Sequence, residues 1–289
     1  MLENVLLYGY TTTYNVEYLI PYVMPYVERL GYDKFIVYDN GSTDKTIELL
    51  KQYPFVEIRH FDTNGAFSDK RICDLHAEAV IECGALDDGS REVWMTWTDF
   101  DEVFYLSEFY PFKEYLHNMK KYWGYNYYSD KMVELFFNNF RTHSVKEHEL
   151  VHTLPDIMCH YWEREGVKPS VICVSDMQFL TVYPGNHWME VIPKKDVSLN
   201  NLKNTFQLFS FHLKYIDFET FEKKMEERAQ RLEKENKDIL EHEWLFNPNC
   251  FKECLSACFP ITTYFALRNL EDKGNGTHKE GLILTYSHD

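Results

Sequence analysis

Basic residues are scarce in this chain relative to acidic ones. It carries 30 lysine and arginine residues against 46 aspartate and glutamate residues, which gives a formal net charge of −16. Nucleic-acid backbones are bound through clustered lysine and arginine, so this balance argues against a nucleic-acid partner. The charge instead favours a neutral or cationic substrate, or an anionic one whose charge a metal ion masks.

Long apolar runs and paired cysteines are also missing. No stretch of about 18 consecutive apolar residues occurs, and so we expect no transmembrane helix. The N-terminus lacks the basic segment, apolar stretch and small-residue site of a secretory signal. The seven cysteines include no CxxC pair of the kind that binds zinc. Together these absences predict a reducing, cytoplasmic compartment.

Apolar and aromatic residues, by contrast, are abundant enough to build a packed core, at 45% and 17% of the chain. In the N-terminal part, apolar runs typical of buried strands alternate with helical patterns. Ser42 and Ser68 are suited to cap the second and third helices, and Gly31 to end the first. The predicted strands are Val5–Tyr8, Phe35–Tyr38, Val56–Phe61 and Val93–Thr98, and the predicted helices are 18–30, 42–50 and 68–83.

This alternation predicts an α/β fold with a mainly parallel sheet flanked by helices on both faces. Ligands of such sheets bind outside the carboxyl ends of the strands. That rule selects three segments as candidate site turns: Thr11–Thr13, Asp39–Gly41 and Asp99–Glu102.

The pattern beyond Tyr105 is less regular. Residues 132–140, 171–174 and 206–211 are predicted strands. From Phe218 to about Leu245 the chain is strongly charged, with apolar residues at helical spacing, and it predicts a long solvated helix with i,i+4 charge pairs on its exposed face. We therefore divide the chain into a domain of residues 1–215 and a helical C-terminal extension of residues 216–289.

The acidic residues at the end of the fourth strand suit a metal ion. Asp99 and Asp101 are two apart, so on an extended segment both side chains point the same way while Phe100 points into the core. Two convergent carboxylates suit a hard divalent cation such as Mg²⁺ or Mn²⁺. An acidic turn in solvent has the same composition, and it is the position after a very apolar strand that favours the metal site.

Three stretches of sequence carry a family resemblance. Residues 15–19 place Asn15 and Glu17 at the opening of the first helix, residues 31–46 read GYDKFIVYDNGSTDKT, and residues 99–102 read DFDE. These stretches resemble the glycosyltransferases of the GT-A (Rossmann-like) fold, and within them the family-2-like group. The resemblance implies transfer of a sugar from a nucleotide-diphosphate sugar to a glycan or other hydroxyl acceptor, with Mn²⁺ or Mg²⁺ as cofactor. Tyr14 and the Val16 inserted in the Asn–Glu pair depart from the group's pattern and leave the contacts of this loop open.

The resemblance also implies roles for single residues. Thr11 and Asp39 would contact the base and ribose of the nucleotide, Asp99 the ribose or the metal, and Asp101 the metal, with Glu102 as support. Asp39 is equally suited to an Asx turn that caps the next helix. Independently of the resemblance, the position of Lys70 and Arg71 after the third strand would let them approach the diphosphate or the base; a solvated first turn of the following helix is the alternative.

Relatives of this fold often complete the metal site with a histidine. His212 follows an apolar strand and is the preferred third ligand, with His187 second; a hydrogen-bonded structural role is the alternative for each. An inverting enzyme also needs a carboxylate base to deprotonate the acceptor hydroxyl. Glu190 is the preferred candidate, with Asp156 and Asp176 as alternatives, and the stereochemistry stays open.

Two other functions compete with sugar transfer. A sugar-1-phosphate nucleotidyltransferase would need a glycine-rich basic loop near residues 10–14, and none is present. A non-catalytic carbohydrate-binding or scaffold module would not need Asp99 and Asp101. The expected partners are a nucleotide-sugar donor, with UDP-sugars expected first on family grounds, and a carbohydrate acceptor that stacks on aromatic side chains.

Overall fold

The structure is a computed structural model of the chain. It describes residues 2–64, 66–106, 111–129, 132–137, 157–161, 169–182, 189–203, 208–215, 223–224, 226–228, 230–231 and 259–260. Among these residues no helix is both long enough and apolar enough to cross a membrane.

Four parallel strands make up one side of the larger sheet, in the order β4-β1-β2-β3, with β3 at the edge. Their bounds are β1 Val5–Thr13, β2 Lys34–Asp39, β3 Val56–His60 and β4 Glu92–Trp97. Beyond β4 the order continues through β9 (Pro169–Cys173), β6 (Tyr127–Ser129) and β12 (Asn201–Lys203). Because β9 runs antiparallel to both β4 and β6, the seven-stranded sheet is mixed. The predicted α/β class is confirmed.

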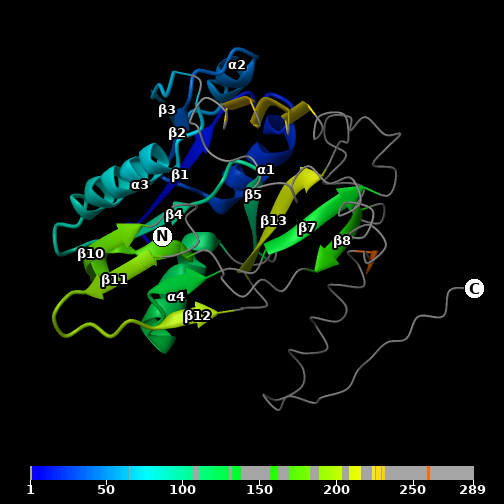
Figure 1. The fold of residues 1–289 in the computed structure, drawn as a ribbon. Helices are drawn as coiled ribbons and strands as arrows, with labels where there is room; N and C mark the ends of the chain where they lie inside the picture. The colour runs from blue at the N-terminus through cyan, green and yellow to red at the C-terminus, as the bar shows by residue number, and fades with distance from the viewer. Residues whose placement is uncertain are drawn as a thin grey trace, which may run out of the picture.

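Helices cover both faces of this sheet. Their bounds are α1 Ile20–Leu30, α2 Thr46–Leu50, α3 Asp69–Gly84 and α4 Phe112–Trp123. Leu7 of β1 belongs to the same buried cluster as α1 and α4, whereas Tyr10 belongs to the cluster under α3. The two core layers therefore lie on opposite faces, as the alternation of strand side chains requires, and Figure 1 shows α3 and α4 on opposite sides of β4.

A second sheet begins where β4 ends. It has the order β14-β8-β7-β13-β5, with the bounds β5 Glu102–Leu106, β7 Met132–Phe137, β8 Ile157–Tyr161, β13 Leu208–Tyr215 and β14 Phe259–Pro260. Residues 98–101 are the turn that carries the chain from β4 into β5. This β4–β5 turn is therefore the junction of the two sheets (Figure 1).

A separate two-stranded sheet consists of β10 (Met177–Val182) and β11 (Met189–Pro193), paired antiparallel. It follows the short 3₁₀ helix η2 (Val174–Asp176), and β10 packs against α3. Neither this hairpin nor α4 was predicted. Phe112, Tyr115, Leu116 and Met119 have the i, i+3, i+4, i+7 spacing of an amphipathic helix, so the signal for α4 was present in the sequence.

Several predicted boundaries need correction. The strand β1 continues to Thr13, so residues 11–13 are strand and not a turn. Helix α2 begins only at Thr46, where the Asp44 carboxylate, and not Ser42, accepts the first N–H. The predicted cap at Ser68 is confirmed, since its hydroxyl accepts the N–H of Arg71, and Gly31 ends α1 in the left-handed conformation with φ of 70°.

The C-terminal extension is described in only a few places. Residues 223–224, 226–228 and 230–231 are helical, which agrees with the start of the predicted helix. The rest of residues 216–289, apart from the two residues of β14, lies outside the described residues, so the proposed domain boundary stays a prediction.

Candidate active site

The β4–β5 turn is built from its own residues. Phe100 is 5% exposed and packs in the core, as predicted. The N–H of Glu102 donates to the carbonyl of Asp99 at 3.0 Å, and the Glu102 carboxylate accepts the N–H of Asp99 at 3.2 Å. The segment from Asp99 to Asp101 is thus a closed turn, and the predicted extended geometry is wrong. Glu102, itself 6% exposed, braces this turn.

The turn meets a histidine that is distant in the sequence. The strand β13 pairs antiparallel with β5 and places His212 opposite Glu102. The N–H of Leu213 donates to the carbonyl of Asp101 at 2.8 Å, and Nε2 of His212 lies 3.4 Å from Oδ2 of Asp101. The structure therefore brings together two of the three predicted metal ligands, and the third, Asp99, lies in the same turn.

A bound cation requires ligand atoms of suitable spacing and chemistry, and Nε2 of His212 and Oδ2 of Asp101 can be compared with both requirements. Bonds of roughly 2.1 Å at right angles place two donor atoms about 3 Å apart, close to the separation of Nε2 of His212 and Oδ2 of Asp101. Side chains of these two residues are 14% and 29% exposed, so the pair is reached from one side. Among the described residues, no group of three His, Cys, Asp or Glu side chains has the geometry to hold a metal ion. A carboxylate and water ligands suit either Mn²⁺ or Mg²⁺, and the imidazole favours Mn²⁺ of the two.

Asp39 ends β2 at the same edge of the sheet. Its side chain is buried and accepts the N–H groups of Gly41 and Ser42, each at 3.1 Å. The Asx turn that the sequence offered as an alternative role is therefore present. Nδ1 of His60, at the end of β3, lies 3.3 Å from the Asp39 carboxylate. A carboxylate has about four acceptor positions, so these contacts leave capacity for a ligand.

Thr13, which belongs to a candidate segment but was given no role of its own, pairs with Asp39 across the ends of β1 and β2. Its hydroxyl oxygen is buried and has no hydrogen-bond partner within the part of the chain that the structure describes. The predicted residue Thr11 lies two positions further inside β1 and is fully buried. Thr13 therefore replaces Thr11 as the threonine at the strand end, and the strand's length was the missing information.

Hydrogen bonds link the loop after β1 to the loop after β2. Asn15 accepts the N–H of Thr43 at 2.8 Å and donates its own N–H to the hydroxyl of Ser42 at 2.9 Å. Glu17 accepts the N–H of Lys45 at 2.8 Å. The two motif segments thus form one unit, and Asn15 has a φ of 50°, a left-handed conformation that asparagine tolerates well.

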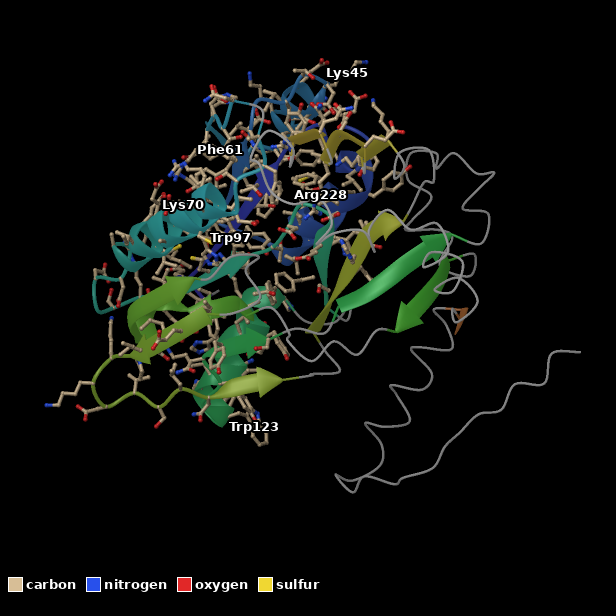
Figure 2. The ribbon with its side chains drawn as sticks, viewed as in Figure 1. Lys45, Phe61, Lys70, Trp97, Trp123 and Arg228 are labelled. Carbon is tan, nitrogen blue, oxygen red and sulfur yellow. The ribbon has the colours of Figure 1, made fainter. Side chains whose placement is uncertain are left out.

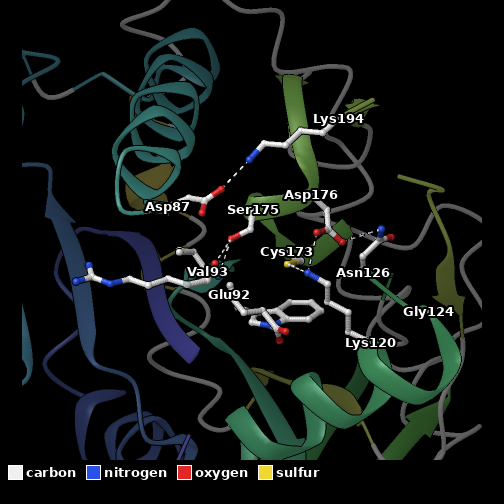
Figure 3. A network of polar contacts seen from close by, with 12 residues as sticks. Asp87, Glu92, Val93, Lys120, Gly124, Asn126, Cys173, Ser175, Asp176 and Lys194 are labelled. Atoms are coloured by element: carbon white, nitrogen blue, oxygen red, sulfur yellow. Dashed lines mark hydrogen bonds and ion pairs between the residues drawn. The ribbon is translucent and has the colours of Figure 1, made fainter. Parts of the chain in front are cut away.

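Three predicted residues lie elsewhere. Lys70 is in the first turn of α3, its side chain is 85% exposed, and it pairs with Asp74 (Figure 2). This is the solvated arrangement that the sequence offered as the alternative. Glu190 is exposed on β11, in the two-stranded sheet. Asp176 pairs with Lys120 at 2.7 Å and accepts a hydrogen bond from Asn126 (Figure 3), which is a structural role. Asp156 and His187 lie outside the described residues.

The charged helical segment of residues 223–231 corrects another prediction. Lys224, Arg228 and Arg231 are each half-buried rather than solvated, and all three face aromatic rings. The predicted exposed face does exist on the other side, where Lys223 lies 3.9 Å from Glu227. Helical spacing alone does not tell which face of a charged helix is covered.

Two 4-diphosphocytidyl-2C-methyl-D-erythritol synthases are among the solved structures similar to this chain. One is 4-diphosphocytidyl-2C-methyl-D-erythritol synthase from Anaerococcus prevotii DSM 20548, with 10% identity and a TM-score of 0.31, covering 79% of this chain and 97% of that chain. The other is a 4-diphosphocytidyl-2C-methyl-D-erythritol synthase with 10% identity and a TM-score of 0.30, covering 60% of this chain and 76% of that one. No curated protein matches the sequence.

A protein-family model matches most of the chain. It is the model of glycosyltransferase family 92, and the match covers residues 10–245. The matched region includes the end of β1, Asp39, the β4–β5 turn, His212 and the helical segment of residues 223–231. The chain therefore belongs to glycosyltransferase family 92, whose members are enzymes that transfer a sugar from a nucleotide sugar.

Proposed function

We propose that this glycosyltransferase uses a divalent cation, Mn²⁺ or Mg²⁺, held at the β4–β5 turn by Asp101 and His212 with Asp99 beside them. The observation that carries the proposal is the 3.4 Å approach of His212 to Asp101. A chance acidic turn would not be expected to receive an imidazole from a distant strand, with the neighbouring backbone hydrogen-bonded at 2.8 Å.

In this proposal each residue of the turn has a separate task. Asp101 and His212 supply one oxygen and one nitrogen ligand, and Asp99 faces the ribose or the cation. Glu102 fixes the backbone of the turn, so that the carboxylates are in place before the donor binds. A bound cation would neutralise the charge that develops on the leaving nucleoside diphosphate.

The nucleotide would lie over the ends of β1 and β2. The Asp39 carboxylate can accept a hydrogen bond from a base N–H or a ribose hydroxyl, and Thr13 has a buried hydroxyl available for the same ligand. The resemblance of residues 31–46 to the family-2-like group supports this placement, and it makes a UDP-sugar the first donor to test. The acceptor would be a carbohydrate or glycan.

The base remains a proposal with two candidates, Glu190 and Asp156. If the reaction inverts the anomeric centre, a carboxylate must take the proton of the acceptor hydroxyl. Replacing each by its amide tests this point: the base variant should lose kcat with little change in KM for the donor, whereas a surface carboxylate should change neither.

The competing functions receive no support. Residues 10–13 are part of β1, so the glycine-rich loop of a nucleotidyltransferase has no place there. Family membership likewise favours an enzyme over a non-catalytic module.

The test is donor hydrolysis and transfer with a panel of UDP-, GDP-, CMP- and dTDP-sugars, with Mn²⁺, with Mg²⁺ or with EDTA. We expect turnover of one donor, loss of that turnover in EDTA and its return when metal is added. Asp74→Asn on the exposed face of α3 is a matched control for Asp101→Asn, because both remove one carboxylate charge. Full activity in EDTA would sink the proposed cation site.

A further inference from the structure

The helical segment 223–231 has a cationic face that is half-buried against the body of the protein. Lys224, Arg228 and Arg231 are spaced four and three residues apart, so they share one side of a helix. We refer to these three residues as the cation cluster. In a chain with a net charge of −16, three half-buried cations on one face are an unusual local excess of positive charge.

The cation cluster lies against the loops that follow β1 and β3. Nζ of Lys224 is 4.7 Å from the ring centre of Tyr18, and Cζ of Arg231 is 4.1 Å from that of Tyr14. Cζ of Arg228 is 5.1 Å from the ring centre of Phe67. These loops leave the carboxyl ends of their strands, the edge where Asp39 and the β4–β5 turn also lie. Figure 2 labels Arg228, and the segment is yellow in Figure 1, at the same side of the molecule as α1 and α2.

Backbone contacts fix one end of the segment in this position. The guanidinium of Arg231 donates to the carbonyl of Ala66 at 3.1 Å, and the N–H of Phe67 donates to the carbonyl of Arg231 at 3.4 Å. The segment is thus attached to the loop after β3. The carboxylate of Asp101, in the β4–β5 turn, acts electrostatically on the ammonium group of Lys224.

The cations lack full compensation. Nε of Arg228 and Nε of Arg231 are buried, and neither has a hydrogen-bond partner within the described part of the chain. Burial lowers the pKa of Lys224, although the carboxylates of Asp101, Glu227 and Asp44 oppose the shift. Withdrawing cations from water is costly unless an anion pairs with them. Aromatic rings offer only part of that compensation.

We propose that the cation cluster of Lys224, Arg228 and Arg231 binds the diphosphate of the nucleotide-sugar donor. The diphosphate would then have the β4–β5 turn on one side and the cation cluster on the other. Guanidinium groups suit phosphate because their planar N–H groups can donate two parallel hydrogen bonds. The inference rests on the proposed function for the identity of the ligand, a nucleoside diphosphate, but it does not require the cation at Asp101.

If the cation cluster binds the diphosphate, the protein should have a measurable affinity for that group even when no metal ion is present. Isothermal titration of the full chain with UDP and with uridine, both in EDTA, isolates the contribution of the phosphates from that of the base. We expect UDP to bind more tightly than uridine, by about tenfold or more, since hydrogen bonds to charged groups contribute this much.

Three variants of the cation cluster and one control decide the outcome. Arg228→Gln and Lys224→Met should each reduce the advantage of UDP over uridine by about tenfold and leave uridine binding unchanged. Lys223→Gln removes the same charge from the exposed face of the segment and should change neither affinity. Arg228→Lys, which keeps the charge, should retain part of the advantage, and unchanged circular dichroism shows that each variant is folded.

The proposal is overturned if the wild-type chain binds UDP no more tightly than uridine in EDTA, or if Lys223→Gln weakens UDP binding as much as Arg228→Gln does. Failure of the proposed cation site looks different. In that case Asp101→Asn leaves the response to Mn²⁺ intact, while the metal-free advantage of UDP is still present and still depends on Arg228.

Discussion

The two ends of strand β4 carry polar clusters of opposite kinds. At the amino end, Lys120 donates to Asp176 at 2.7 Å and to the thiol of Cys173 at 3.2 Å, and Asn126 donates to the second oxygen of Asp176 at 3.1 Å (Figure 3). Each charge there has a partner within the cluster. Burial disfavours the charged ammonium, but Cys173 and Asp176 raise the pKa of Lys120 above its ordinary value, so the lysine is charged at neutral pH.

The carboxyl end of β4 carries a different set of contacts. His212 approaches Asp101, and Lys224 lies within electrostatic reach of it. Thr13 and Arg228 have buried polar atoms without a hydrogen-bond partner among the described residues. A cluster that is satisfied by its own members stabilises the fold, whereas buried polar atoms without a hydrogen-bond partner suit a ligand.

Breaking the amino-end cluster should have the largest effect on stability. Lys120→Met leaves the carboxylate of Asp176 buried without its cation, and such a loss costs about 3–5 kcal/mol. The side chains of the pair are 24% and 13% exposed, so water offers limited compensation. Urea unfolding measures the change, and donor affinity of the folded fraction should stay at the wild-type value.

The double variant Lys120→Met/Asp176→Leu sharpens this prediction. Replacing both charges by apolar groups removes the unpaired carboxylate and should restore most of the stability that the single variant loses. If the double variant were as unstable as the sum of its parts, the ion pair would not be the source of the effect.

Breaking the carboxyl-end cluster should affect activity and not stability. Asp101→Asn removes a cation ligand, and loss of one such charge-stabilising group costs about a hundredfold or more in kcat. The side chain of Asp101 is 29% exposed, so the thermal midpoint should shift little. Initial rates with saturating donor and Mn²⁺ measure the loss; an active Asp101→Asn enzyme beside an equally active Asp74→Asn control would contradict the assignment.

The carboxyl end was the more predictable of the two. Asp39, Asp99 and Asp101 follow apolar strands in a regular strand–helix alternation, and the rule for parallel sheets then places them at one edge. The position of Thr13 could not be predicted, because residues 11–13 are held in β1 by pairing with β2. Strand pairing of this kind has no local sequence pattern.

Long-range packing accounts for the remaining differences. Asp176 was an alternative candidate for the base, and only its tertiary contacts with Lys120 and Asn126 mark it as structural. The charge run at residues 223–231 was interpreted as solvated, since the helical period does not reveal the rings that cover one of its faces.

The hydrogen bonds between the loops after β1 and β2 should contribute less to the free energy of unfolding than the Lys120–Asp176 pair does. Asn15→Ala removes the acceptor for the N–H of Thr43 and puts alanine at a φ of 50°. The lost hydrogen bond and the backbone strain together cost about 1–3 kcal/mol. Asn15→Gly removes the acceptor without the strain, and so it should lose less. Urea unfolding of both variants separates the two contributions; equal losses would show that strain has no part.

The smallest effect is expected at Lys70, and it bears directly on where the diphosphate lies. Its side chain is 85% exposed and pairs with Asp74 across one turn of α3. Exposed pairs of this type contribute about 0.5 kcal/mol or less, so Lys70→Gln should leave stability and the affinity for UDP close to the wild-type values. Lys70 and Arg228 both belong to elements near the loop after β3, yet only Arg228 has a buried donor in need of an acceptor. If Lys70→Gln weakened UDP binding as much as Arg228→Gln does, the diphosphate would reach α3. Burial of a cation would then no longer distinguish the side chains that bind the diphosphate from those that lie solvated on the surface.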